Sequence, residues 1–225
     1  TVTDINSCVP EQDANFTIGE PDQLQISIID QTDALCFEQE SGTVTYAVTG
    51  GTPPYTIDGA TFVEELTDGT YIYEDLTLFE GTYTATVIDN TGICDETSDE
   101  FIIGEPDQLQ ISVINQTDAI CFGEASGTVT YAVTGGTPPY TIDGATFVEE
   151  LTDGTYIYED LTLFEGTYTA TVIDNTGICD ETSDEFIIGE PEQLQISVVE
   201  QTDAICFGEA SGTVTYSISG GTPPY

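Results

Sequence analysis

The chain repeats itself with a period of 85 residues. Residues 19–103 and 104–188 align without a gap and differ at only six positions. A third copy begins at Gly189 and runs to residue 225, and residues 1–18 resemble the end of a further copy. Such repetition restricts the fold to a series of similar small domains, each contacting its neighbours along the chain. We therefore expect a partial repeat, two complete units and a truncated unit, all belonging to a longer, elongated array.

The charge of the chain is entirely of one sign. There are 42 Asp and Glu residues and no Lys, Arg or His, which gives a formal net charge of −42. Side-chain salt bridges are therefore impossible, and every carboxylate must be solvated, hydrogen-bonded or neutralised by a small cation. Nucleic acid is excluded as a partner because phosphate contacts need Lys or Arg. The apolar content of 39% is nevertheless enough for a buried core.

Alternation of apolar and polar residues predicts about seven short strands in each unit and no helix. In the second unit we expect Val129, Tyr131 and Val133 to face inward, and Tyr168 to tie down the corner before the sixth strand. Seven short strands with frequent Gly and Pro turns are typical of an antiparallel β-sandwich. The expected strands are residues 109–114, 128–135, 140–143, 145–151, 155–161, 166–174 and 179–188.

Three segments of each unit resemble a known family. "GTVTYAVTGGTPPYTI", "LFEGTYTATVIDNTGIC" and "FIIGEP" are similar to the SprB-type repeat of long cell-surface adhesins from gliding and other Bacteroidota. The resemblance implies tandem Ig-like β-sandwiches in a secreted, extracellular protein of the cell surface. It also implies an adhesive or filament role.

The cysteines recur twice per repeat, which in an apparently secreted array indicates disulfides. Zinc is not expected, because the sequence contains no C-x-x-C motif and no His. The candidate disulfide residues are Cys8, Cys36, Cys94, Cys121, Cys179 and Cys206.

Two pairing schemes fit the sequence, once Cys36–Cys94 is set aside because a nine-residue strand of about 30 Å would separate that pair. In the first scheme "EPDQ" (105–108) is a hairpin turn, which predicts Cys94–Cys121 and its equivalents, Cys179–Cys206 and Cys8–Cys36. In the second scheme "GEP" is a linker between domains, which predicts Cys36–Cys179. We favour the first scheme because each bond then closes a short local loop.

The acidic stretch "DETSDE" occurs once in each complete unit and is the best candidate for a cation site. Carboxylates four residues apart on a strand, such as Asp95 and Asp99, share a face, and calcium prefers oxygen ligands. A solvated acidic edge that discourages aggregation explains the same residues. The candidate calcium ligands are Asp89, Asp95, Asp99, Asp174, Asp180 and Asp184.

Enzymatic activity is not expected. General bases and activated nucleophiles usually depend on His, Lys or Arg, and the adjacent acids at Glu149–Glu150 and Glu159–Asp160 would point to opposite faces of a strand.

The sequence instead predicts a stalk or filament segment of a secreted cell-surface adhesin. The expected partners are neighbouring repeats, other chains of a filament, or surface glycans, with no direct membrane insertion. The alternative is a module that binds carbohydrate or another surface through its "GGTPPY" loop. Binding loops tend to vary between copies, whereas residues 41–103 and 126–188 are identical, which favours the stalk.

Overall fold

The computed structural model describes residues 5–6 and 17–225 and divides them into two compact units. Unit 1 contains the chain up to Thr32 together with Gly42–Ile103, and unit 2 contains Asp33–Ser41 and Gly104–Tyr225. Residues 33–41 belong to the first sequence repeat but lie in unit 2. In the described part of the chain, no helix is long and apolar enough to cross a membrane.

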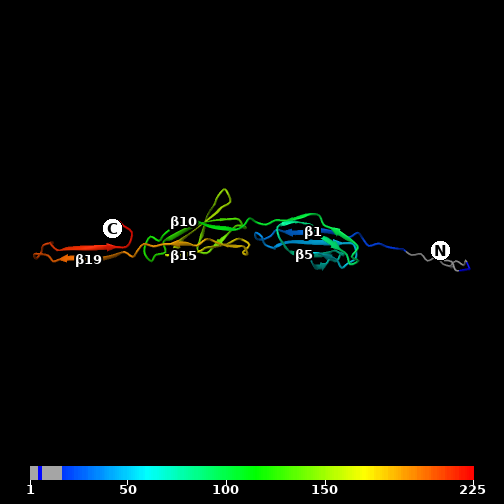
Figure 1. Ribbon diagram of the computed structural model, residues 1–225, viewed down its shortest axis with the longest axis horizontal. Coiled ribbons are helices and arrows are strands. Elements are labelled where there is room, and N and C mark those ends of the chain that lie inside the picture. The colour runs from blue at the N-terminus through cyan, green and yellow to red at the C-terminus, as the bar shows by residue number, and fades with distance from the viewer. Residues whose placement is uncertain (1–4, 7–16) are drawn as a thin grey trace. The chain divides into compact units, whose positions relative to one another are not determined.

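Unit 1 contains strands β1 to β9, of which β1 and β5 are labelled in Figure 1. They are β1 (Gln25–Thr32), β2 (Gly42–Thr49), β3 (Thr56–Ile57), β4 (Thr61–Glu65), β5 (Tyr71–Leu78), β6 (Gly81–Tyr83), β7 (Thr86–Ile88), β8 (Asp95–Thr97) and β9 (Phe101–Ile103). All neighbouring strands pair antiparallel.

Unit 2 repeats this series and then continues into a separate hairpin, drawn in red in Figure 1. Its strands are β10 (Gln110–Thr117), β11 (Gly127–Thr134), β12 (Thr141–Ile142), β13 (Thr146–Glu150), β14 (Tyr156–Leu163), β15 (Gly166–Tyr168), β16 (Thr171–Ile173), β17 (Asp180–Thr182) and β18 (Phe186–Ile188). The hairpin consists of β19 (Gln195–Thr202) and β20 (Thr213–Ser219).

The strand order identifies the sandwich as Ig-like. In unit 2 one sheet has the order β10-β11-β14-β13 and the facing sheet has the order β12-β16-β17, which β15 and β18 extend. Lettered A to G along the chain, these sheets are ABED and CFG, the arrangement of an immunoglobulin constant-type domain. Unit 1 has the same two orders, β1-β2-β5-β4 and β3-β7-β8. The predicted all-β, Ig-like sandwich is confirmed.

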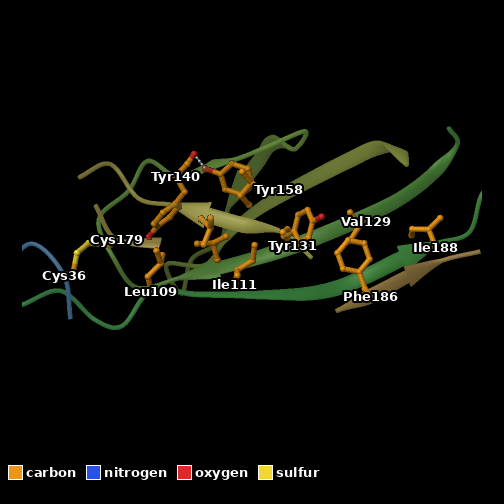
Figure 2. Close-up of a cluster of buried hydrophobic side chains, with 14 residues drawn as sticks. Cys36, Leu109, Ile111, Val129, Tyr131, Tyr140, Tyr158, Cys179, Phe186 and Ile188 are labelled. Atoms are coloured by element: carbon orange, nitrogen blue, oxygen red, sulfur yellow. Dashed lines mark hydrogen bonds between the residues drawn. A yellow bond between two sulfur atoms is a disulfide. The ribbon is translucent and has the colours of Figure 1, made fainter. Parts of the chain in front are cut away.

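A buried apolar layer holds the two sheets of unit 2 together (Figure 2). The residues predicted to face inward do so: Val129 and Val133 are fully buried, and Tyr131 is 4% exposed. The facing sheet contributes Val172 and Ile188, both fully buried. Apolar burial of this kind stabilises a domain by roughly 25 cal/mol for each Å² removed from water.

In each unit a tyrosine fixes the same loop. The hydroxyl of Tyr168 donates to the Phe164 carbonyl oxygen at 3.0 Å, and that of Tyr83 donates to Phe79 at 3.1 Å. This is the tyrosine corner predicted from the sequence. Burial, assisted by the charge of Asp160, raises the pKa of Tyr131 to about 12, so this phenol stays neutral inside the sandwich.

The two longest predicted strands are each interrupted. Residues 166–174 form β15 and β16, and residues 179–188 form β17 and β18. At the break, the Ser183 hydroxyl accepts a hydrogen bond from the Ala170 N–H at 3.0 Å, and the Ser183 N–H donates to the Ala170 carbonyl at 2.8 Å. The Ser183 side chain thus replaces one backbone hydrogen bond between the two strands. The alternation of apolar and polar residues does not predict such a break.

Replacing Gly127 with Ala should destabilise unit 2. A Cβ atom at Gly127 would lie 2.5 Å from Cγ2 of the buried Ile188 and 3.0 Å from the Leu163 carbonyl oxygen. Overpacking of this kind typically costs about 1–3 kcal/mol, so the unit 2 transition in a denaturant titration should move to lower denaturant. Gly19→Ala is the control because nothing lies within 4 Å of its added Cβ. Equal shifts in both variants would contradict the packing described here.

Candidate functional site

A disulfide joins residues of two consecutive sequence repeats. Cys36 and Cys179 are bonded with a Cα–Cα distance of 5.7 Å and a sequence separation of 143. Both residues lie in unit 2, at the edge of its buried core (Figure 2). They are only 6% and 7% exposed. The bond therefore closes a very long covalent loop at a site with little access to solvent.

Hydrogen bonds to the "GEP" segment hold the loop that carries Cys36, which we call the cysteine loop (residues 33–41). The Ala34 N–H donates to the Gly104 carbonyl at 2.8 Å, and the Gly104 N–H donates to Asp33 Oδ1 at 2.8 Å. The Glu38 N–H donates to Glu105 Oε2 at 2.6 Å. Two carboxylates thus orient the loop by accepting hydrogen bonds from backbone N–H groups, since the chain has no basic side chain to pair with them.

The orienting carboxylates were not predicted from the sequence. Asp33 and Glu105 recur as Asp118 and Glu190, where they make the same contacts: the Gly189 N–H donates to Asp118 Oδ1 at 2.8 Å, and the Gly123 N–H donates to Glu190 Oε2 at 2.6 Å. Their recurrence at a period of 85 residues is the one sequence feature that could have indicated their role. Glu38 adopts a left-handed φ of 54° where its equivalent Gly123 has 71°, a conformation that suits glycine better.

Cys179 lies on a tight turn that we call the hairpin tip (residues 174–180). The buried carboxylate of Asp174 accepts hydrogen bonds from the Thr137 N–H at 3.0 Å and from the Thr176 N–H at 2.9 Å. The Thr176 hydroxyl also donates to Asp174. The turn is closed by the Asp174 N–H, which donates to the Cys179 carbonyl at 3.1 Å. One aspartate therefore fixes the tip and joins it to the "GGTPPY" loop.

The cysteine pairing that we favoured from the sequence is wrong, and the second scheme is correct for Cys36 and Cys179. The pairs Cys179–Cys206 and Cys8–Cys36 are excluded because Cys179 and Cys36 bond each other. Cys94 and Cys121 are free and exposed, as is Cys206, and Cys8 lies outside the described residues.

The error came from reading "EPDQ" as a hairpin turn. The strands on either side of it, β9 and β10, do not pair: β9 pairs with β6, and β10 pairs with β11. The segment connects two sandwiches, as the second scheme assumed.

The structure gives two different environments to the predicted calcium ligands. Asp89 and Asp174 are buried at 4% exposure, with their oxygens occupied by hydrogen bonds. The others are exposed, on β8 and β17 or just after them: Asp95, Asp99, Asp180 and Asp184. Within the described ranges, no group of three or more His, Cys, Asp or Glu side chains could hold a metal ion. Calcium binding stays a prediction.

The "GGTPPY" loop directs its tyrosine into the protein. Tyr140 is 7% exposed, and its hydroxyl donates to the Gly135 carbonyl at 2.6 Å. The Tyr158 hydroxyl in turn donates to the Tyr140 carbonyl at 3.0 Å (Figure 2). Pro138 and Pro139, joined by a cis peptide bond, are the exposed part of the loop. The aromatic side chain therefore contributes to the core and the loop closure.

With this geometry in place, the comparisons with known proteins can be interpreted. Residues 28–61, 113–146 and 198–225 match the family model described as SprB repeat. Three segments of the chain are thus similar to the SprB repeat. Each of the first two matches runs from the first strand of a sandwich through the "GGTPPY" loop, and neither extends to the hairpin tip. No curated protein matches the chain significantly.

Among solved structures, one match is the C-terminal 282-residue fragment of intimin in complex with the intimin-binding domain of the translocated intimin receptor. It shares 14% identity, and the alignment covers 80% of this chain and 67% of that one. The TM-score is 0.29, which is too low to support any inference about this chain.

The tip aspartate of unit 1 should make stability depend on pH. Hydrogen bonds from the Thr91 hydroxyl, the Thr91 N–H and the Thr52 N–H lower the pKa of Asp89 below its ordinary value. Because the folded-state pKa is lower than the unfolded value of about 3.9, its contribution is present above about pH 4 and disappears as the pH falls through the folded pKa. The difference in thermal midpoint between the parent and Asp89→Asn should therefore shrink between about pH 4 and pH 2.

The matched control is Asp95→Asn, which removes the same charge from an exposed position on β8. It corrects for the repulsion that any carboxylate contributes in so acidic a chain. Parallel pH profiles for the two variants, followed by circular dichroism, would show that Asp89 has no special role.

Proposed function

We propose that this chain is a stalk or filament segment of a secreted cell-surface adhesin. The observation that carries the proposal is the Cys36–Cys179 disulfide, which links consecutive sequence repeats covalently. A stalk must transmit position and force from repeat to repeat, so such bonds serve it directly. A protein whose repeats each bind a ligand independently has no need of them.

The uniformity of the repeats supports this role. Residues 41–103 and 126–188 are identical, including every loop between their strands. Binding surfaces concentrate in loops and tend to differ between copies, whereas a spacer needs the same unit many times. The SprB repeats are compatible with a place on the cell surface, where a net charge of −42 would keep neighbouring chains apart by repulsion.

The disulfide also supports an extracellular location, because disulfides form and persist in oxidising compartments and are rare in the cytosol. The buried position of both sulfurs marks this bond as structural, since a transient redox site would need access for a second thiol.

The alternative, a module that binds carbohydrate or another surface, gains less support from the loop on which it was based. An aromatic side chain that stacks on a sugar has to be exposed, whereas Tyr55 and Tyr140 are each 7% exposed and hydrogen-bonded within the protein. In each copy the loop instead exposes two prolines, which could contact a ligand.

Small-angle X-ray scattering of the intact chain tests the stalk. For the parent we expect a distribution of interatomic distances that extends to long distances, as for an elongated particle. For Cys36→Ser/Cys179→Ser the distribution should broaden, because the repeats gain freedom to move relative to one another. Cys121→Ser, which removes an exposed free thiol, should leave the curve unchanged. A compact, nearly spherical particle would contradict the stalk, and saturable binding on a glycan array would favour the alternative.

We further propose that calcium stabilises the array through the exposed acids of β8, β17 and the residues that follow them. A ligand that binds the folded state more tightly raises stability by mass action. The thermal midpoint should rise more in millimolar calcium than in sodium chloride of equal ionic strength, and it should fall again with a chelator. Asp95→Asn/Asp99→Asn should reduce the response. Equal midpoints in the two salts would leave these acids as a solvated, repulsive surface.

A further inference from the structure

We propose that the Cys36–Cys179 bond carries tension past most of both complete repeats, so that they remain folded when the ends of the chain are pulled. The proposal rests on the stalk function, because only a tethering protein is loaded at its ends. The bond spans a sequence separation of 143. A pulling force follows the shortest covalent path, so residues 37–178, which we call the bypassed segment, are not on that path.

Within the two sandwiches, the residues that remain on the path lie mainly in extended strands. The force enters through β1, which leads to Cys36, and leaves through β17 and β18, which follow Cys179. A strand rises about 3.3 Å per residue, close to the upper limit of about 3.6 Å for a fully stretched chain. Tension can therefore lengthen these segments only slightly.

The sandwich strands on the path are not peeled from their neighbours. The hairpin of β19 and β20 also lies on the path but belongs to neither sandwich, and it is expected to open under load because both of its strands carry the tension. β1 pairs antiparallel with β2 from Gln25 opposite Thr49 to Thr32 opposite Thr43. The load enters β1 at one end and leaves it at the other, whereas β2 belongs to the bypassed segment and carries none. The same holds for β17 and β18, whose partners β16 and β15 are bypassed. Force therefore stretches strands that are already straight and does not shear the sheets.

The surroundings of the bond protect it from reduction. Both cysteines are nearly buried, and a hollow of approximately 290 Å³ beside them is lined in part by Glu38, Asp180 and Glu181. A disulfide is reduced by attack of a thiolate, and an incoming thiolate or an acidic thiol such as glutathione would meet negative charge here. The bypass should therefore persist under mild reducing conditions that would open an exposed disulfide.

Single-molecule stretching of the full 225-residue chain, attached through peptide tags without cysteine, tests the proposal. The parent should reach a final length about 500 Å shorter than Cys36→Ser/Cys179→Ser, since a separation of 143 residues at about 3.5 Å each is withheld. The parent should also lack the large unfolding steps of the two sandwiches. A phosphine reductant added at constant force should release the missing length in one or more steps, and Cys121→Ser should behave like the parent.

Two outcomes would overturn the inference: equal final lengths for the parent and the double variant, or unfolding of both complete repeats in the parent before reduction. Neither outcome affects the scattering test of the stalk, which applies no load. Conversely, scattering could show a compact particle while stretching still shows the shorter final length of the parent. That combination would refute the stalk function and support the proposal that the disulfide bypasses residues 37–178.

Discussion

The absence of basic side chains determines how the acidic side chains of this protein find partners. With 42 carboxylates and no Lys, Arg or His, a buried or half-buried acid can be satisfied only by N–H and hydroxyl donors. The recurring solution is Asp-x-Thr, in which the carboxylate accepts from the threonine two residues later, as at Asp75, Asp89 and Asp160. Cysteine-loop carboxylates use the same chemistry. Among described side chains that are not exposed, no fully buried nitrogen or oxygen lacks a partner.

Cohesion within each sandwich then has to come from apolar packing, and cohesion between consecutive repeats from a covalent bond. Val129, Val133 and Val172 are fully buried in unit 2, and their equivalents are fully buried in unit 1. Ion pairs that elsewhere fasten one domain to another are not available here. A disulfide is independent of charge and salt, which suits a chain whose acids repel one another. The way in which the repeats are held together therefore follows from the composition.

Local patterns in the sequence predicted the fold well because they report local physics. Alternation identified the inward faces of the strands, and the Tyr168 corner was visible from its position before the sixth strand. The pairing of Cys179 was not predictable in this way, because the residues of the "GEP" segment are compatible both with a hairpin turn and with a linker between domains. Deciding between them required knowing that β9 and β10 lie in different sandwiches. The burial of Asp174 depends likewise on Thr137, which is distant in sequence.

The central claim is that a disulfide links consecutive repeats, and peptide mapping of the unreduced chain tests it most directly. Free thiols are first alkylated, the chain is digested at acidic residues, and the linked peptides are identified by mass spectrometry. Because the digest peptides around Cys94 and Cys179 are identical, the mapping uses the Cys94→Ser variant, which removes a free thiol and makes the Cys179 peptide unique. The account predicts a linked pair containing Cys36 and Cys179, with Cys121 and Cys206 alkylated. Recovery of Cys179 linked to Cys206 would contradict the account and would confine each bond to a local hairpin.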